Sequence, residues 1–183
     1  AGGDIQILYE NGLKKNFAYG QKFWADEYRL NEKIANYKKP FVAFMQGFTM
    51  GGGVGVSCHG SHRIVGETSK IAMPECSIGL VPDVGGSFLL AKLPGNIGTF
   101  LGVTGKRMNA SDAIYCGFAD YFIPEKKWED LKEKLIATGD IYWIKKFYES
   151  RETSEIEASF SQISEAMDDV SSNNIEARLK HPF

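Results

Sequence analysis

A short apolar run that leads straight into a glycine-rich segment is the feature that most constrains the fold of this chain. Residues 41–45 are all apolar, which is typical of a buried strand. Residues 47–59 then carry Gly47, the triplet 51–53 and Gly55, and this pattern predicts a loop followed by the start of a helix. Because the amides of a first helical turn have no partner within the helix, the segment predicts an element that binds negative charge.

The surrounding residues indicate which negative group such a loop would bind. No Lys-Ser or Lys-Thr pair follows the glycines, and the G-x-G-x-x-G pattern of dinucleotide sites is absent, so phosphate binding is the weaker interpretation. An oxyanion hole for a carbonyl group fits better, because one or two amides suffice. The structural alternative is close packing of a helix on a strand, which also needs small residues, and both interpretations can hold at once.

Residues 73–86 form the second segment with chemical potential. Glu75 and Asp83 each follow a proline, and the segment holds small or apolar residues with no lysine or arginine. A carboxylate in such surroundings tends to have a raised pKa, which makes it a candidate acid, base or nucleophile. Asp83 could instead cap the helix expected just after it. Glu75 has no comparable structural explanation, because its neighbours do not suggest a helix start.

A third acidic residue lies on the helix predicted over residues 16–37. Phe23, Glu27, Leu30 and Ile34 fall on one face of this helix, and Glu27 is the polar member of that stripe. The pattern alone favours a position at the edge of the stripe, where Glu27 would reach into water. The alternative is a carboxylate that reaches into a site.

The remaining pattern predicts alternating short elements with no internal repeat. The expected strands are residues 62–65, 71–73 and 118–123. The expected helices are residues 97–101, 110–114, 125–137, 141–148, 160–167 and 175–179, with a polar linker at 150–155. We expect two regions, a core over residues 1–123 and a helical region over 124–183.

Composition excludes several classes of partner. The 183 residues carry a net charge of −2, which gives no reason to expect nucleic acid, and no apolar run is long enough to span a membrane. The three cysteines are far apart, so a reducing compartment is expected. His59, His62 and His181 lack partners at metal-ligand spacing, and we read them as structural or exposed, with no metal and no separate cofactor.

The chain starts without Met inside a glycine motif, and we expect it to be a fragment.

Several motifs follow one another in a fixed order. They are A-G-G-D at residues 1–4, G-x-x-M-G-G-G at 47–53, M-P-E-x-x-I-G-L at 73–80, D-x-G-G at 83–86, L-x-x-T-G at 101–105 and A-x-D-A at 110–113 followed by Gly117. Together these motifs resemble the crotonase (enoyl-CoA hydratase/isomerase) superfamily. The resemblance runs to about residue 123. It implies an α/β fold of stacked ββα turns with surrounding helices, in which the family's N-terminal strands and C-terminal helices are missing from this chain.

The resemblance also implies roles for individual residues. Hydratases have their first catalytic glutamate where this chain has Gly55, and their second matches Glu75. A thioester-hydrolase subgroup adds an aspartate that matches Asp83 and a helix glutamate that matches Glu27. These matches favour site roles for Glu27 and Asp83 over the structural interpretations. The thioester oxygen would accept hydrogen bonds from the amides of Gly3 and Gly52.

The implied activity is hydrolysis of a small 3-hydroxyacyl-CoA thioester, with 3-hydroxyisobutyryl-CoA of valine breakdown as the expected substrate. Glu75 would act as nucleophile or as general base. Asp83 would orient the 3-hydroxyl group or assist proton transfer to the leaving thiolate, and Glu27 would bind the hydroxyl end. The alternatives are an enoyl-CoA hydratase or isomerase and a non-catalytic structural subunit. Acyl-CoA is the expected partner, with association into a homo-oligomer or with the missing part of the chain also considered. The expected compartment is a bacterial cytoplasm or a mitochondrial matrix.

Overall fold

The chain folds around two small parallel sheets. The structure is a computed structural model that describes residues 4–168. Strands β1 (Val42–Met45), β3 (His62–Val65) and β5 (Tyr121–Phe122) form one sheet in the order β1-β3-β5, and β2 (Phe48–Met50) pairs with β4 (Lys70–Ala72) in the other. Helix α3 (Gly52–Ser57) follows β1 and β2, and the chain then returns to the first sheet at β3. Two strands and a helix therefore make one turn of a spiral, and the predicted α/β fold of ββα turns is confirmed.

Some strands were predicted accurately from the sequence, and others were missed or predicted too long. The strands predicted at residues 41–45 and 62–65 match β1 and β3 to within one residue. Strand β2 was not predicted, because its three residues lie inside the glycine-rich segment where no alternation can be read. Strand β5 is shorter than the stretch 118–123, because the amides of Phe118 and Ala119 donate to the carbonyl oxygen of Ala113 and not to a neighbouring strand.

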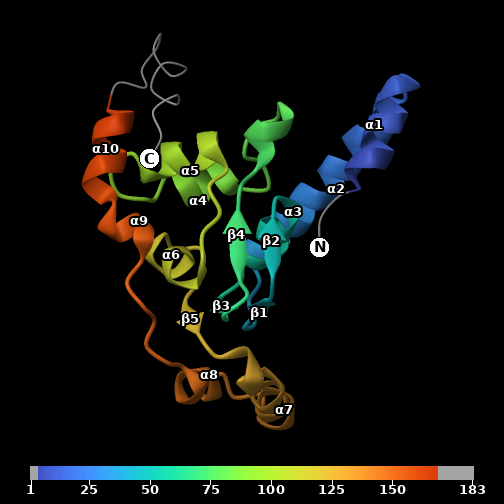
Figure 1. Cartoon of the computed structure of the whole chain (residues 1–183). Helices are drawn as coiled ribbons and strands as arrows, with labels where there is room; N and C mark the ends of the chain where they lie inside the picture. The colour runs from blue at the N-terminus through green and yellow to red at the C-terminus, as the bar shows by residue number, and fades with distance from the viewer. Residues whose placement is uncertain (1–3, 169–183) are drawn as a thin grey trace.

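Helices α1 (Ile5–Leu13) and α2 (Phe17–Ala35) lie on one side of the strands, opposite the helices of residues 155–167 (Figure 1). Helix α1 was not predicted from the sequence. It begins after Asp4, whose carboxylate accepts a hydrogen bond from the amide of Ile7 at 3.2 Å. The stripe proposed for α2 is partly wrong. Ile34 is buried, but Leu30 is 46% exposed, and the second buried residue of α2 is the polar Asn31.

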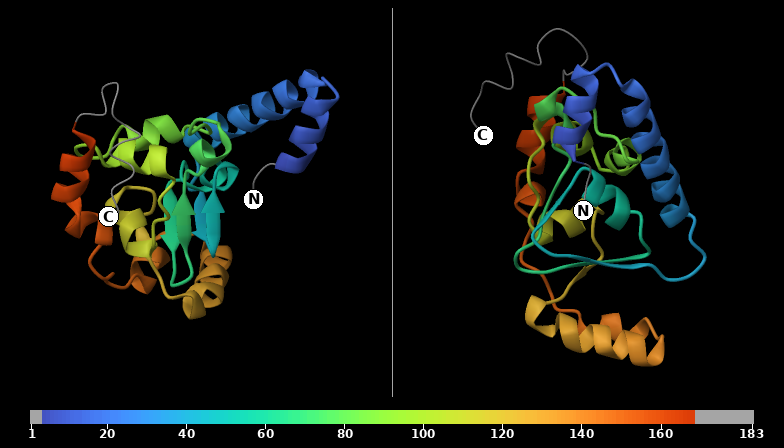
Figure 2. Two further views of the ribbon diagram at one scale, coloured as in Figure 1. Left: turned by 45° about the horizontal axis from the view of Figure 1, so that its top comes forward. Right: turned by 90° about the vertical axis from the view of Figure 1, so that its right-hand side faces the viewer.

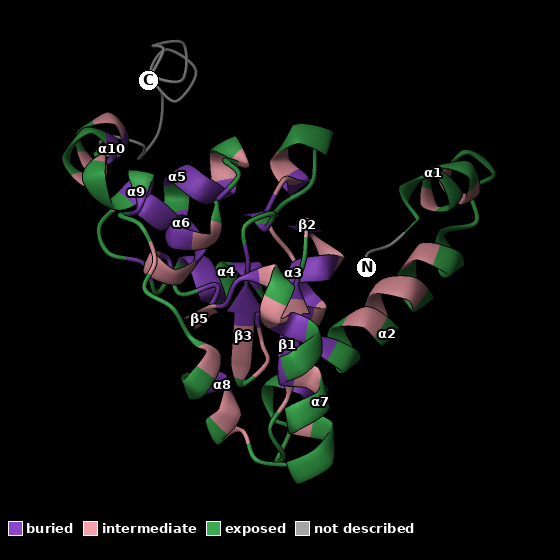
Figure 3. Cartoon of the chain, turned by 60° about the horizontal axis from the view of Figure 1, so that its bottom comes forward, coloured by how far each residue is buried: buried purple, intermediate pink, exposed green. Residues whose placement is uncertain are grey.

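The remaining helices follow β4 in the chain. They are η1 (Glu75–Ile78), α4 (Gly86–Leu90), α5 (Ile97–Thr104), α6 (Ala110–Tyr115), η2 (Glu125–Lys127), α7 (Trp128–Thr138), α8 (Tyr142–Phe147), α9 (Glu155–Ala158) and α10 (Phe160–Met167). Buried residues gather around the strands and helices α5 and α6 (Figure 3), while α7 lies at one end of the molecule (Figure 2). The helix expected at residues 175–179 lies outside the described residues.

Two hydrophobic clusters form the core. The larger joins the strands and α3 to α5 and α6, and it also contains Ile156 and Ile163 from α9 and α10. The smaller packs Trp128, Leu131 and Ile144 of α7 and α8 against Ile64 of β3. Residues from both sides of position 123 thus share both clusters, and the division at 123 stays a prediction.

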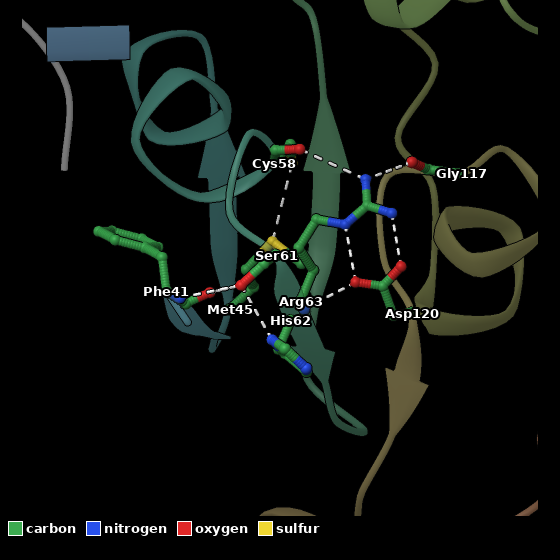
Figure 4. A network of polar contacts seen from close by, with 8 residues as sticks. All are labelled: Phe41, Met45, Cys58, Ser61, His62, Arg63, Gly117 and Asp120. Atoms are coloured by element: carbon green, nitrogen blue, oxygen red, sulfur yellow. Dashed lines mark hydrogen bonds and ion pairs between the residues drawn. The ribbon is translucent and has the colours of Figure 1, made fainter. Parts of the chain in front are cut away.

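A polar network ties β3 to the segment that leads into β5 (Figure 4). Arg63 donates to both carboxylate oxygens of Asp120, from Nε at 2.9 Å and from Nη2 at 2.5 Å. Its Nη1 donates to the carbonyl oxygens of Cys58 at 3.3 Å and Gly117 at 2.5 Å. The side chain of Arg63 is only 16% exposed, so this planar fork satisfies four acceptor atoms in a largely dry place.

The Arg63→Lys variant should lower the free energy of unfolding by about 2 kcal/mol, because a single ammonium group cannot replace the bidentate fork. Reversible urea unfolding of the full-length protein measures this loss. The matched control is Arg29→Lys on α2, where the side chain is 74% exposed and pairs with Asp26. That control should change stability by less than about 0.5 kcal/mol. Equal losses in both variants would contradict the assigned role of the network.

Candidate active site

A cavity of about 270 Å³ lies between helix α2, the start of α3 and the segment that joins η1 to α4. Four of the candidate site residues predicted from the sequence line it, namely Glu27, Gly52, Glu75 and Asp83. The rest of its wall is mostly apolar and includes Phe23, Trp24, Met50, Ile78 and Leu80. Gly3, the other residue expected to offer an amide, lies outside the described residues.

Glu75 is the most enclosed acid of the cavity. Its residue is 6% exposed, and its Oε2 atom is buried without a hydrogen-bond partner. Burial raises the pKa of this carboxyl group, and the charge of Asp83 raises it further. Glu75 begins the 3-10 helix η1, so the expectation that its neighbours exclude a helix start is wrong. The short helix directs the carboxylate inward, against the start of α3.

Asp83 does not cap a helix. Helix α4 begins at Gly86 with Gly85 as its N-cap, and no side chain bonds to its first amides. The carboxylate of Asp83 instead accepts a hydrogen bond of 2.7 Å from the hydroxyl of Tyr28 on α2. Tyr28 was not predicted as a site residue, because its only signal in the sequence is its place directly after Glu27. This bond joins the segment before α4 to the helix that carries Glu27.

Glu27 is half-buried and lines the cavity, so the position in water that the helix pattern alone favoured is wrong. Its role in binding substrate stays a prediction. Burial raises the pKa of Glu27, and the neighbouring charge of Asp83 adds to that effect. Asp26 behaves as a solvated acid, because it is half exposed and pairs with Lys22 at 2.5 Å and with Arg29 at 2.9 Å. The two adjacent acids of α2 therefore have opposite environments.

The start of α3 brings backbone amides to the same cavity. Gly51 has a φ of 51°, and a Cβ atom there would lie 3.0 Å from Oε1 of Glu75. The amides of Val54 and Gly55 turn back to the carbonyl oxygen of Gly51, whereas Gly52 precedes them at the first helical position, where an amide has no acceptor within the helix. Because Gly52 also lines the cavity, its amide is the donor that we expect a carbonyl group beside Glu75 to meet.

Among the residues that the structure describes, no cation forms an ion pair with any of the three acids, Glu27, Glu75 and Asp83. Over the same residues, no three His, Cys, Asp or Glu side chains are arranged to hold a metal ion, and no helix is long and apolar enough to cross a membrane. Three carboxylates that share one cavity without a cation can exchange protons and accept hydrogen bonds from a polar substrate group.

A ββα spiral that places a glycine-rich helix start against buried acids defines the crotonase class of fold. The family model described as enoyl-CoA hydratase/isomerase matches residues 1–182, and the chain belongs to this family.

Curated relatives and solved structures point to two activities. The chain is 46% identical over 137 residues to the mitochondrial 3-hydroxyisobutyryl-CoA hydrolase of Xenopus tropicalis, and this match covers 75% of this chain and 35% of the relative. It is 41% identical over 139 residues to a probable 3-hydroxyisobutyryl-CoA hydrolase of Arabidopsis thaliana, over 76% of this chain and 37% of the relative. The crystal structure of an enoyl-CoA hydratase from Rhodobacter sphaeroides matches with a TM-score of 0.90 and 49% identity, over 100% of this chain and 53% of that one. The chain thus spans little more than a third of the length of these curated relatives.

Proposed function

We propose that the protein containing this chain hydrolyses a small 3-hydroxyacyl-CoA thioester, most specifically 3-hydroxyisobutyryl-CoA. The observation that carries the proposal is the buried, unpartnered Oε2 atom of Glu75 in a cavity that also holds the Gly52 amide and two further acids. A cavity of about 270 Å³ suits a short acyl group. The relatives named 3-hydroxyisobutyryl-CoA hydrolase support the same choice of substrate.

In the proposed reaction the thioester oxygen accepts a hydrogen bond from the Gly52 amide, which stabilises the negative charge that develops on it. The amide of Gly3 is the second donor that the family pattern assigns. Glu75 then either attacks the carbonyl carbon to form a mixed anhydride, which water cleaves, or removes a proton from the attacking water. Both routes end with the carboxylic acid and a free CoA thiol.

Asp83 and Glu27 bind the 3-hydroxyl end of the substrate. Both acids line the cavity, and the charge of Asp83 acts on Glu27 and on Glu75. A substrate hydroxyl that donates to Asp83 would reduce the repulsion within this group. Asp83 has a second proposed task, which is to assist proton transfer to the leaving thiolate.

The second candidate function is hydration of an enoyl-CoA, which the similarity to the Rhodobacter sphaeroides enoyl-CoA hydratase favours. Position 55 argues against it, because the resemblance puts a catalytic glutamate of hydratases there and this chain has glycine. A Cβ atom at Gly55 would lie 2.8 Å from both Nδ2 of Asn31 and Cβ of Val84, so the site has no room for a second acid. A non-catalytic subunit is less consistent still with an unpartnered buried carboxylate.

Thiol release and enoyl hydration, measured side by side on the full-length protein, test the proposal. We expect CoA thiol to be released from 3-hydroxyisobutyryl-CoA, and crotonyl-CoA to keep its enoyl absorbance under the same conditions. Loss of that absorbance without thiol release would favour the hydratase instead. The compartment, bacterial cytoplasm or mitochondrial matrix, stays a proposal, as does association into oligomers.

A further inference from the structure

The residue that follows Asp83 has a strained backbone. Val84 has a φ of 46°, in the left-handed region that β-branched residues rarely adopt, and it is 2% exposed. Such a conformation costs about 1–3 kcal/mol and persists only where neighbouring contacts enforce it. The strain lies one residue from a carboxylate of the cavity, so the contacts that hold Val84 also determine where Asp83 stands.

His59 makes the polar contact that holds this backbone. It follows α3, 25 residues before Val84, and its Nε2 lies 2.7 Å from the carbonyl oxygen of Val84. Because a carbonyl oxygen only accepts, Nε2 must carry the proton. The ring also lies close under the next residue, since a Cβ atom at Gly85 would stand 2.6 Å from Nε2. The bond therefore constrains the middle of the turn formed by residues 83–85.

The side chain of Val84 is held from a second direction. Its Cβ would lie 2.8 Å from a Cβ atom at position 55, so Val84 rests against the bare backbone of Gly55. The amide of Asn31 closes the same space from α2, and both its polar atoms are buried without a partner. The amide of Gly86 completes the turn by donating to the carbonyl oxygen of Asp83 at 2.5 Å.

We propose that His59 is a positioning residue for Asp83: by holding the carbonyl group of Val84, it keeps the turn in the left-handed conformation that presents the Asp83 carboxylate to the cavity. The inference rests on the proposed function, because it gives Asp83 a task in substrate binding. His59 itself does not line the carboxylate cavity and acts only through the backbone. Without its hydrogen bond, the turn relaxes toward an ordinary conformation and Asp83 leaves its place beside Tyr28.

Substitutions at His59 in the full-length protein test this inference. The His59→Leu variant removes the donor, and kcat for 3-hydroxyisobutyryl-CoA should fall about 10- to 100-fold, as expected when a reacting group is misplaced by about 1 Å. The His59→Gln variant keeps an N–H group near the position of Nε2 and should recover most of the lost activity. His62→Leu is the control, because His62 bonds to Ser61 and takes no part in the turn.

Two combined variants separate positioning from a general loss of structure. In an Asp83→Asn background, His59→Leu should cause little further loss, because both changes affect the same group. In a Val84→Gly background, His59→Leu should cost less than it does alone, because glycine adopts the left-handed conformation without strain. The proposal is overturned if the losses of activity from Asp83→Asn and His59→Leu multiply in the double variant. It is also overturned if His59→Gln loses as much activity as His59→Leu while the two variants have equal thermal stability.

A crystal structure of His59→Leu gives a readout that does not depend on turnover. We expect residue 84 to leave the left-handed region and the Tyr28–Asp83 hydrogen bond to break, while His59→Gln keeps both features. An unchanged turn in His59→Leu would overturn the inference even if the enzyme hydrolyses the proposed substrate. If wild-type protein releases no thiol but the turn relaxes as expected, the proposed function fails and the positioning role stands.

Discussion

The full-length protein is expected to cleave 3-hydroxyisobutyryl-CoA with a kcat/KM about 10⁴-fold higher than that for isobutyryl-CoA, which lacks the hydroxyl group. Sites built to hydrogen-bond a substrate hydroxyl reject the analogue without it by about 10⁴–10⁵, because their buried polar groups are left unpaired. Here those groups are Glu27 and Asp83, two half-buried acids that repel each other and form no ion pair within residues 4–168.

Thiol release from the two thioesters measures this ratio. In Glu27→Gln and Asp83→Asn variants the ratio should shrink, mainly through a lower kcat/KM for the hydroxylated substrate. Asp26→Asn is the matched control, because Asp26 is adjacent to Glu27 but its carboxylate accepts hydrogen bonds from Lys22 and Arg29. Wild-type protein that cleaves both thioesters equally well would show that neither acid binds the hydroxyl group.

The second large effect is expected for Glu75→Gln, which should lower kcat by about 10²–10⁴-fold and leave KM nearly unchanged. Glutamine has nearly the same shape, so it keeps the cavity filled, but it can neither attack the thioester nor take a proton from water. Glu32→Gln on the exposed face of α2 is the control and should behave as wild type.

Stability measurements distinguish this loss from unfolding. Because burial raises the pKa of Glu75 in the folded protein, its ionised form costs stability at pH values above that pKa. The Glu75→Gln variant should therefore be at least as stable as wild type at pH 7–8 in thermal unfolding. A variant that is both inactive and clearly less stable would assign Glu75 a structural role instead.

The sequence predicts those features of the site that depend on residue type and local order. The apolar run before the glycines identifies β1, and the acids without neighbouring cations identify Glu75 and Asp83 as candidates for chemistry. Glu27 needed the family resemblance, because a helix pattern cannot separate an acid at the edge of a stripe from one that faces a cavity.

The contacts that hold the acids in place could not be predicted from pattern. Tyr28 reaches Asp83 across 55 residues and His59 reaches Val84 across 25, and no local periodicity encodes such distances. Val84 adopts the left-handed conformation although valine, as a β-branched residue, strongly prefers a negative φ. Only the contacts in the folded protein explain this conformation. Asn31 is buried and Leu30 is exposed, although the helix pattern predicted that Leu30 would be buried. This burial likewise follows from how α2 packs against α3 and against the turn of residues 83–85.

Release of CoA thiol from 3-hydroxyisobutyryl-CoA by the full-length protein is the measurement that tests the central claim most directly. We expect saturable release, with one molecule of 3-hydroxyisobutyrate formed for each thiol. No thiol release from a folded full-length protein that hydrates crotonyl-CoA would contradict the claim that these three acids and the Gly52 amide form a thioesterase site.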